Sequence, residues 1–300
     1  MSDDGELFPH FFVIGAQKAG TSTLCAMLDA HPRIIVSNPK EPRIVSRMDL
    51  SVHPQMAMHH IEWWREAAYG DPREWVPRLY AEVFPDRRGD SLLGDGTTGT
   101  MLSRLAPGLI HDFRPAAKII VILRHPVLRA YSAYWHHLRN GTAAADIRTF
   151  LLLENNFAIT TGCYEAVLRP WLATFPRDQI LVLVYEEFFK ASLTQIDLVT
   201  DFLGVQRVPA VENLHVNRGL YPAEIGFHVG LHELRAQMQR EGTLSVAADR
   251  TVEAALRANL SEEHPPPMDP RLFMDLERYF QLANAGLNDL LDQDVTRHWW

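Results

Sequence analysis

The chain has 300 residues, of which 47% are hydrophobic and 22% are charged, a composition typical of a globular protein with a sizeable core. Its formal net charge of −8 argues against a general nucleic-acid-binding protein, because that class usually carries excess positive charge. There are two cysteines and no Cys-His spacing of the kind seen in zinc sites, so the sequence favours neither a disulfide framework nor a structural metal centre.

The first ten residues, MSDDGELFPH, are acidic and lack the charged-then-apolar pattern of a leader peptide. No apolar run approaches the roughly 20 residues that a membrane helix needs. We therefore expect a soluble protein of the reducing cytoplasm without a membrane span. Length alone permits one large or two smaller domains, and we predict one domain over residues 1–300.

Three short apolar segments predict buried strands: FFVIGA (11–16), KIIVILR (118–124) and QILVLVYEEF (179–188). Each is followed by a turn and a helical pattern. RIIV (33–36) and SLLG (91–94) are weaker strand candidates. This alternation predicts an α/β fold, a three-layer sandwich in which helices cover both faces of a central parallel sheet.

The helices between these strands have clear boundaries in the sequence. The first ends at the His-Pro pair 31–32, and the second begins at Pro126 and ends at the Asn-Gly pair 140–141. The third lies in LTQIDLVTDFLG (193–204), where Gly204 is the stop signal.

Two stretches, 45–80 and 205–270, show no regular periodicity but contain aromatic residues. We interpret them as insertions, helical in part, that cap a cleft. Further along, RLFMDLERYFQLANAGLNDLL (271–291) predicts one helix or a bent pair.

The segment after the first strand has the form of an anion-binding loop. Gly15 and Gly20 let the backbone approach a ligand, and the N–H groups at the following helix start point towards it. A nucleotide-triphosphate P-loop reads G-x-x-x-x-G-K-[ST], whereas here Lys18 precedes the second glycine. The alternative is an ordinary strand-to-helix turn with a solvated lysine.

A P-loop kinase using ATP and magnesium also needs a metal ligand, usually an Asp at the end of an apolar strand. The second strand ends instead in Arg124, which supplies positive charge without a metal. Tyr185-Glu186-Glu187 after the third strand are possible cation ligands, although acidic residues there are more often surface or cap groups. The pattern points away from magnesium-dependent phosphoryl transfer.

Arg124 and Ser132, eight positions later on the next helix, offer a guanidinium fork and a hydroxyl that suit a phosphate. Taken singly, each is as well explained as a surface residue. Together, IGAQKAGTSTL (14–24) and VILRHPVLRAYSAY (121–134) resemble the sulfotransferases that use 3′-phosphoadenosine 5′-phosphosulfate (PAPS). The likeness is greatest to the heparan-sulfate type group and its bacterial relatives, and weaker similarity continues through 162–188, 201–205, 217–222 and 287–300.

The resemblance implies a single sulfotransferase domain with a P-loop-like 5′-phosphosulfate loop, PAPS as donor, 3′-phosphoadenosine 5′-phosphate (PAP) as product, and no metal. Lys18 would stabilise charge on the bridging oxygen as PAP leaves. The donor-binding residues that it implies are Lys18, Ala19, Gly20, Thr21, Ser22, Thr23, Arg124, Ser132, Arg218 and Gly219.

Glu41, in NPKEPRIVSR (38–47), is the candidate base that takes the acceptor's proton. The heparan-type group has a Lys-Glu pair here, which Lys40 and Glu41 match. The residues that follow, Pro42-Arg43-Ile44, depart from the aromatic or His-rich run of that group. The alternative is a solvated ion pair in a turn.

A second departure lies in GDGTTGT (94–100), where the group commonly has an acidic-Lys-Thr/Ser-Pro pattern. Gly96 stands in place of that lysine. Asp95 is an alternative base, or part of an ordinary Asp-Gly turn. Further candidate bases in the irregular region are His53, His59 and His60.

The sequence leaves the acceptor open among a small molecule, a lipid, a carbohydrate and a carrier-bound intermediate, and it excludes no oligomeric state. A non-catalytic nucleotide-binding protein remains an alternative, as does the kinase. We predict that Tyr164 packs in the core, because Leu168 and Trp171 share its helix face.

Overall fold

The computed structural model describes residues 7–52, 65, 68–85, 87, 89–143, 146–151, 157–207, 219–263 and 265–300. The chain divides into two compact units. The first comprises Met1–His125, Cys163–Val216 and Ala283–Trp300, and the second comprises Pro126–Gly162 and Asn217–Leu282. The prediction of one domain over residues 1–300 stays a prediction.

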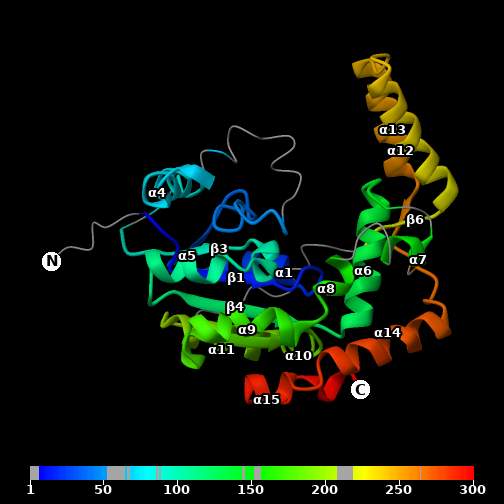
Figure 1. Cartoon of the computed structure of the whole chain (residues 1–300). Helices are drawn as coiled ribbons and strands as arrows, with labels where there is room; N and C mark the ends of the chain where they lie inside the picture. Colours follow the sequence, from blue (N-terminus) through cyan, green and yellow to red (C-terminus); the bar gives the residue numbers. More distant parts are fainter. Residues whose placement is uncertain are drawn as a thin grey trace. The chain divides into compact units, whose positions relative to one another are not determined.

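The first unit contains a five-stranded sheet in the order β2-β3-β1-β4-β5, with every neighbouring pair parallel (Figure 1). The strands are β1 (Phe11–Gly15), β2 (Ile34–Val36), β3 (Leu92–Asp95), β4 (Lys118–Leu123) and β5 (Ile180–Val184). All five predicted segments therefore form strands, including the two weaker candidates. The central strands β1 and β4 are buried almost throughout, as continuous apolar sequence predicts for a sheet covered on both faces.

The third predicted strand, 179–188, is too long at its end. β5 stops at Val184, and the next residues form the short helix α10 (Tyr185–Phe188). Successive residues of a strand point to opposite faces, so extending β5 would place the carboxylate of Glu186 on one covered face of the sheet and that of Glu187 on the other.

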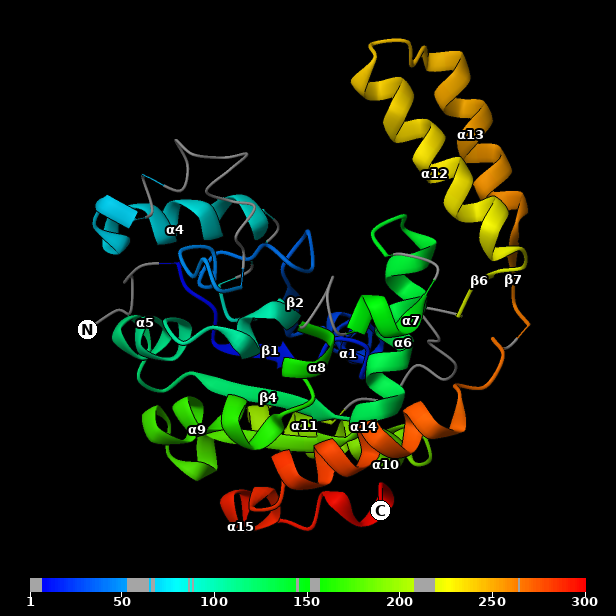
Figure 2. The same ribbon diagram turned by 45° about the vertical axis from the view of Figure 1, so that its right-hand side comes forward.

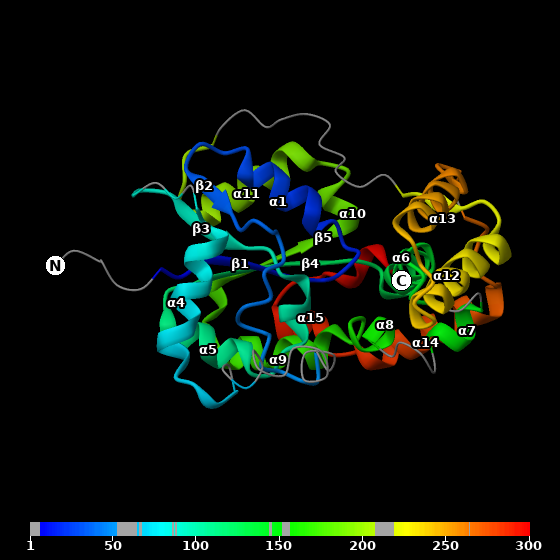
Figure 3. The ribbon, with the colours of Figure 1, turned by 90° about the horizontal axis from the view of Figure 1, so that it is seen from above.

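Helices cover both faces of this sheet (Figure 3). α1 (Thr21–Asp29) and α11 (Ser192–Leu203) lie on one face, and α5 (Ala106–Phe113), α9 (Tyr164–Thr174) and α15 (Leu287–Leu291) lie on the other. The first unit also contains α4 (Pro72–Val83) and the 3-10 helices η1 (Thr98–Leu102), η3 (Arg177–Gln179) and η4 (Thr296–His298). The three-layer α/β architecture expected from the sequence is confirmed.

The predicted helix boundaries are also confirmed. α1 ends at Asp29, just before the His-Pro pair, and α11 ends at Gly204, whose φ of 73° is the left-handed conformation that glycine adopts readily. Segment 271–291 forms two helices, α14 (Pro270–Ala283) and α15.

The second unit is mostly helical. Its other helices are α6 (Pro126–Arg139), α7 (Ile147–Thr149), α8 (Phe157–Thr160), α12 (Ile225–Arg240) and α13 (Val246–Ala258), and its two short strands are β6 (Tyr221–Pro222) and β7 (Leu260–Ser261), paired antiparallel. None of the helices in the described part of the chain combines the length and apolar character needed to cross a membrane.

The stretch 205–270, which we expected to be helical in part although its sequence shows no regular periodicity, contains two long regular helices. α12 and α13 run side by side as a helical hairpin (Figure 2). The Ser245 hydroxyl caps α13 by accepting a hydrogen bond from the Ala248 N–H at 3.1 Å, a signal that the sequence carries. Gly226 and Gly230 dilute the apolar pattern of α12, which explains why periodicity did not reveal it.

Part of the other irregular stretch, 45–80, is also helical. Asp71 caps α4 through a bond from the Arg73 N–H, and Pro72 occupies the first helical position. Trp75 is buried in the core, whereas Tyr69 is exposed. Residues 53–64 lie outside the described residues, and with them Trp63, Trp64 and the candidate bases His53, His59 and His60.

Candidate active site

The five strands of the first unit are parallel, so their carboxyl ends meet at one edge of the sheet. Ligand sites of open α/β sheets form at this edge. The segments that leave β1 to β5 there carry, in chain order, Lys18, Glu41, Asp95, Arg124 and Glu186. The structure thus gathers the predicted site residues of this unit at one edge.

The loop from Gly15 to Gly20 begins at the end of β1 and leads into α1. Lys18 and Gly20 both have positive φ, 67° and 88°. Gly20 is the N-cap residue and has no side chain to satisfy the first N–H groups of the helix. Those groups and the positive end of the helix dipole suit an anion, so the segment from Gly15 to Thr23 is called the anion-binding turn below, and its predicted role in donor binding stays a prediction. The resemblance also implies Ala19 as a donor ligand, but its N–H already donates to Ala16 O at 3.1 Å.

Close packing against α10 is a second reason for glycine at position 20. A Cβ there would lie 2.5 Å from Cε2 of Phe189 and 3.5 Å from Cδ2 of Tyr185. Both the positive φ and this contact exclude a larger residue. The aromatic residues after β5 therefore support the anion-binding turn.

Arg124 lies directly beside this turn. Its Nη1 donates to Lys18 O at 2.8 Å, and its Cζ lies 4.4 Å from the centroid of the Tyr185 ring. A guanidinium over an aromatic face is attracted by the ring and keeps a fixed orientation. Arg124 is therefore held beside the anion-binding turn by contacts within the protein.

The backbone around Arg124 is held as well. The Tyr164 hydroxyl donates to Arg124 O at 2.7 Å, and the His125 N–H donates to Glu186 Oε1 at 3.0 Å. Tyr164 is completely buried, so the prediction that it packs in the core is confirmed. The same core residue also fixes the end of β4.

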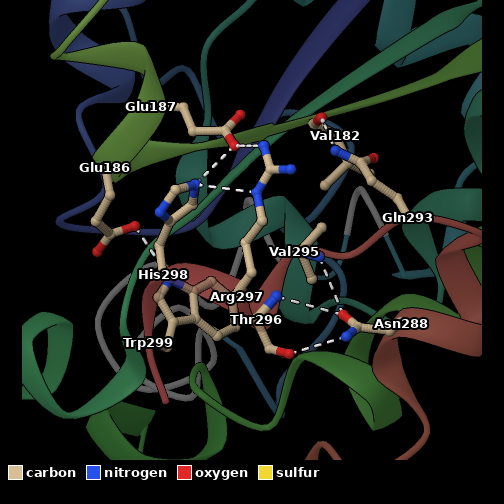
Figure 4. A network of polar contacts seen from close by, with 10 residues as sticks. All are labelled: Val182, Glu186, Glu187, Asn288, Gln293, Val295, Thr296, Arg297, His298 and Trp299. Atoms are coloured by element: carbon tan, nitrogen blue, oxygen red, sulfur yellow. Dashed lines mark hydrogen bonds and ion pairs between the residues drawn. The ribbon is translucent and has the colours of Figure 1, made fainter.

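Glu186 and Glu187 bind the segment from Gln293 to Trp300 (Figure 4). The Trp299 Nε1–H donates to Glu186 Oε2 at 3.0 Å, and His298 lies 2.8 Å from Glu187 Oε1, which also pairs with Arg297. The Trp299 ring packs on Tyr164 with centroids 5.6 Å apart. This segment therefore reaches the residues that hold Arg124.

Burial opposes the ionisation of Glu187, but hydrogen bonds from Arg297 and His298 outweigh it and lower the pKa of this carboxyl. Both acidic residues after β5 are thus engaged by protein groups. In the described part of the chain, no three His, Cys, Asp or Glu side chains gather in a group that can hold a metal ion.

Glu41 lies on the segment that follows β2. Its Oε1 accepts a hydrogen bond from the Thr98 hydroxyl at 2.9 Å and lies 3.3 Å from Lys40 Nζ. Lys40 Nζ is also 3.3 Å from Oγ1 of Thr21, the first residue of α1. The candidate base and the anion-binding turn are therefore connected through one lysine.

Asp95, the alternative base, has a different setting. Only 1% of the residue is exposed, and its two oxygens accept bonds from the Tyr80 hydroxyl and the Thr97 N–H, each at 2.8 Å. Burial raises the pKa of Asp95, which its hydrogen bonds only partly offset. Asp95 holds the turn after β3, and Glu41 is the more exposed of the two carboxylates.

The remaining predicted donor ligands do not belong to the described part of the first unit. Ser132 is on α6 and Gly219 precedes β6, both in the second unit. Arg218 lies outside the described residues. Their predicted roles stay predictions.

Sequence reasoning missed three supporting residues: Thr98, Tyr185 and Trp299. Tyr185 directly follows β5, and Thr98 begins η1 three residues after the end of β3. Because the carboxyl ends of parallel strands meet at one edge of the sheet, their positions in the sequence are a signal that points to them. Nothing local marks Trp299, which comes into contact only through the tertiary fold.

A family model described as the sulfotransferase family matches residues 9–209, about two thirds of the chain. The chain belongs to the sulfotransferase family. The resemblance drawn from the loop after β1 and the segment around Arg124 is thereby confirmed. The matched region includes the entire sheet of the first unit.

Curated relatives support this assignment. This chain is 27% identical over 227 residues to carbohydrate sulfotransferase 15 of Rattus norvegicus, an alignment covering 60% of this chain and 40% of the relative. It is 27% identical over 226 residues to heparan sulfate glucosamine 3-O-sulfotransferase 3A1 of Mus musculus, covering 73% and 51%. The chain thus spans about half or less of these relatives.

A crystal structure of a sulfotransferase from Alicyclobacillus acidocaldarius shares the fold. It superposes with a TM-score of 0.65 at 22% identity and covers 97% of this chain and 98% of that one.

Proposed function

We propose that this sulfotransferase moves the sulfuryl group of PAPS to a hydroxyl or amine acceptor and releases PAP. The observation that carries the proposal is the link from Glu41 through Lys40 to Thr21, with both contacts at 3.3 Å. The Glu41 carboxylate, which is suited to take a proton, and the N–H groups at the start of α1, which are suited to bind an anion, are therefore separated only by the ammonium of Lys40.

The donor would lie along the anion-binding turn. The N–H groups of Gly20 to Thr23 and the hydroxyls of α1 would bind its 5′-phosphosulfate, and Arg124 would bind its 3′-phosphate through the guanidinium fork. Lys18, on the same turn, would neutralise the bridging oxygen. The donor contacts that the resemblance implies for Ser132, Arg218 and Gly219 stay predictions from the sequence.

Transfer would occur by in-line displacement. The acceptor oxygen or nitrogen forms a bond to sulfur while the bond from sulfur to the bridging oxygen breaks. The electron pair of the broken bond stays on the 5′-phosphate of PAP, and the acceptor's proton passes to Glu41. Positioned donors aimed at this developing charge are the usual source of large rate gains. Because a sulfuryl group carries less charge than a phosphoryl group, the step needs no metal.

The contacts of Glu186 and Glu187 favour this reaction over the kinase alternative. Glu186 accepts bonds from His125 and Trp299, and Glu187 binds Arg297 and His298, so neither is arranged as a magnesium ligand. The lysine that follows the second glycine in kinase P-loops is Thr21 here.

For the acceptor, we propose a carbohydrate hydroxyl as the first class to test. The support is the names of the relatives, which are a carbohydrate sulfotransferase and a heparan sulfate glucosamine 3-O-sulfotransferase. A phenol, a long-chain alcohol and a carrier-bound hydroxyl represent the other acceptor classes that the sequence leaves open.

The test is radiolabelled sulfate transfer from PAPS to this acceptor panel by the wild type and by Glu41→Gln. We expect Glu41→Gln to lower turnover by about 100-fold or more while PAP affinity stays unchanged. Asp95→Asn is the comparison and should cost stability without a selective loss of turnover. Undiminished transfer by Glu41→Gln would place the base elsewhere, and failure of the wild type to bind PAP would reject the donor assignment.

A further inference from the structure

Lys40 occupies an unusual place in this site. Its ammonium contacts Glu41 Oε1 and Thr21 Oγ1, so it bridges the candidate base and the first turn of α1. Its side chain is 25% exposed and that of Glu41 is 33% exposed, so both are partly open to solvent and reachable by a ligand. An ordinary surface lysine has neither a second partner nor this position.

Two hydrogen bonds to its carbonyl oxygen hold the backbone of Lys40 in place. Lys40 O accepts bonds from the Gly96 N–H at 3.2 Å and from the Ser37 hydroxyl at 3.0 Å. The bond from Gly96 joins the segment after β2 to the turn after β3, a neighbouring strand of the sheet, and the bond from Ser37 lies within the segment after β2. The Lys40 backbone is therefore as firmly placed as the strand ends themselves.

The absence of a side chain at Gly96 makes room for Lys40. A Cβ at position 96 would lie 2.9 Å from Lys40 Cγ and 2.9 Å from Cys25 Sγ. Lys40 thus passes over Gly96 on its way to Thr21, with Cys25 packed below. A side chain at position 96 would therefore collide with the Lys40 side chain in its present conformation.

We infer that Lys40 is a catalytic cation that binds the sulfuryl group of the donor, a role that rests on the proposed function. An ammonium has three N–H donors, and the two contacts above use two of them. The third suits a sulfonyl oxygen of a donor whose phosphate lies at the N-terminus of α1. Lys40 contacts this group while sulfur leaves the bridging oxygen, bonds to the acceptor and the proton passes to Glu41.

This assignment also accounts for Gly96. The resemblance to heparan-type sulfotransferases leads one to expect a lysine at position 96, and its absence removes a positive charge from that turn. Lys40, which matches the Lys-Glu pair of that group, passes over Gly96 from the neighbouring strand end and keeps one positive charge beside the turn. Its compact point charge fits this space better than the broad fork of an arginine.

The test compares binding of PAPS and of PAP, which lacks the sulfuryl group, to the wild type and to Lys40→Met. Methionine keeps an apolar stem over Gly96 and removes the charge. We expect PAPS affinity to fall about tenfold, as for the loss of one charge-assisted hydrogen bond, and PAP affinity to change less than twofold. Lys190→Met, an exposed lysine of the same unit, controls for net charge.

Three outcomes would overturn the inference. Equal weakening of PAPS and PAP would make Lys40 a phosphate ligand, and unchanged PAPS binding would remove it from the donor site. If the effect on PAPS disappears in a Glu41→Gln background, Lys40 acts only through Glu41. A wild type that binds PAP normally keeps the proposed function intact in all three cases.

Discussion

At the scale of single residues, the site depends on a few side chains whose orientation is set before a ligand arrives. Arg124 is the clearest case, because the Lys18 carbonyl and the Tyr185 ring hold its guanidinium at the anion-binding turn. Such preorganisation lowers the cost of binding, since the side chain loses little freedom when the ligand arrives.

Arg124→Ala is expected to weaken PAP binding by about 30- to 100-fold, the value of a bidentate charge-assisted contact. Adenosine 5′-monophosphate, which lacks the 3′-phosphate, should bind the variant within about threefold of the wild type. Calorimetric titration of both nucleotides measures the difference. Arg207→Ala, which removes an exposed arginine of the same unit, is the matched control.

Because Arg124 also binds Lys18 O, the variant has a second possible effect. An equal loss for both nucleotides would show that Arg124 acts by holding the loop rather than by binding the 3′-phosphate.

Residue identities around the site were only partly predictable. Lys18, Glu41 and Arg124 each directly follow a strand or lie in a motif, so sequence alone singles them out. Thr98 and Tyr185 follow strands too, but a threonine or a tyrosine carries no distinctive chemistry until the partner is known. The bond from the Ala19 N–H to Ala16 O was not predictable, because it depends on the positive φ of Lys18.

At the scale of elements, the segment from Gln293 to Trp300 contacts the residues that hold the backbone at Arg124. Trp299 bonds Glu186, which binds the His125 N–H, and it packs on Tyr164, which bonds Arg124 O. Two paths thus lead from one indole to the peptide group that joins Arg124 and His125. A segment far away in sequence becomes part of the site's support.

Trp299→Phe keeps most of the ring and removes the N–H that binds Glu186. We expect a three- to fivefold loss of PAP affinity, equivalent to about 0.7–1 kcal/mol for one hydrogen bond, with no change for adenosine 5′-monophosphate. The effect should vanish in an Arg124→Ala background. Trp75→Phe is the matched control, since Trp75 is also buried in the first unit and its Nε1 has no hydrogen-bond partner among the described residues.

If Trp299→Phe weakens both nucleotides alike, the indole stabilises the unit in general and does not position Arg124.

The ion pairs of Glu187 predict a pH dependence. The pKa of Glu187 is lower in the folded than in the unfolded chain. Its contribution to the free energy of unfolding is therefore complete above the ordinary carboxyl pKa of about 4.3. This contribution is lost as the pH falls through the lower pKa of the folded state. Glu187→Gln should melt about 1–2 °C below the wild type at pH 7, and the two curves should converge in acid. A constant difference from pH 7 to pH 3 would contradict this.

Element types were more predictable than element lengths. Continuous apolar sequence marks the strands that are buried on both faces, such as β1 and β4, whereas the short segments of β2 and β3 were weaker candidates. β5 was drawn too long because valine and tyrosine continue the strand pattern into α10, and α12 was missed because its glycines and histidines hide its period.

At the scale of the whole molecule, parallel order explains why residues from distant parts of the chain can share one site. The order β2-β3-β1-β4-β5 places the donor strand β1 between β3 and β4, so the segments carrying Thr98 and Arg124 flank the anion-binding turn. Under the proposed function, this order places the candidate base Glu41 on the β2 and β3 side of that turn and Arg124 on the β4 and β5 side. The fold class was predictable from sequence, whereas the division into two units was not, because no change in composition marks its boundaries.

The central claim is that this edge of the sheet binds PAP without a metal. Calorimetric titration of the wild type with PAP in the presence of EDTA, beside ATP with magnesium, tests it most directly. We predict tight PAP binding in EDTA and much weaker binding of ATP, together with a rise in melting temperature on adding PAP. Preference for ATP with magnesium, or PAP binding that requires a metal, would contradict the claim.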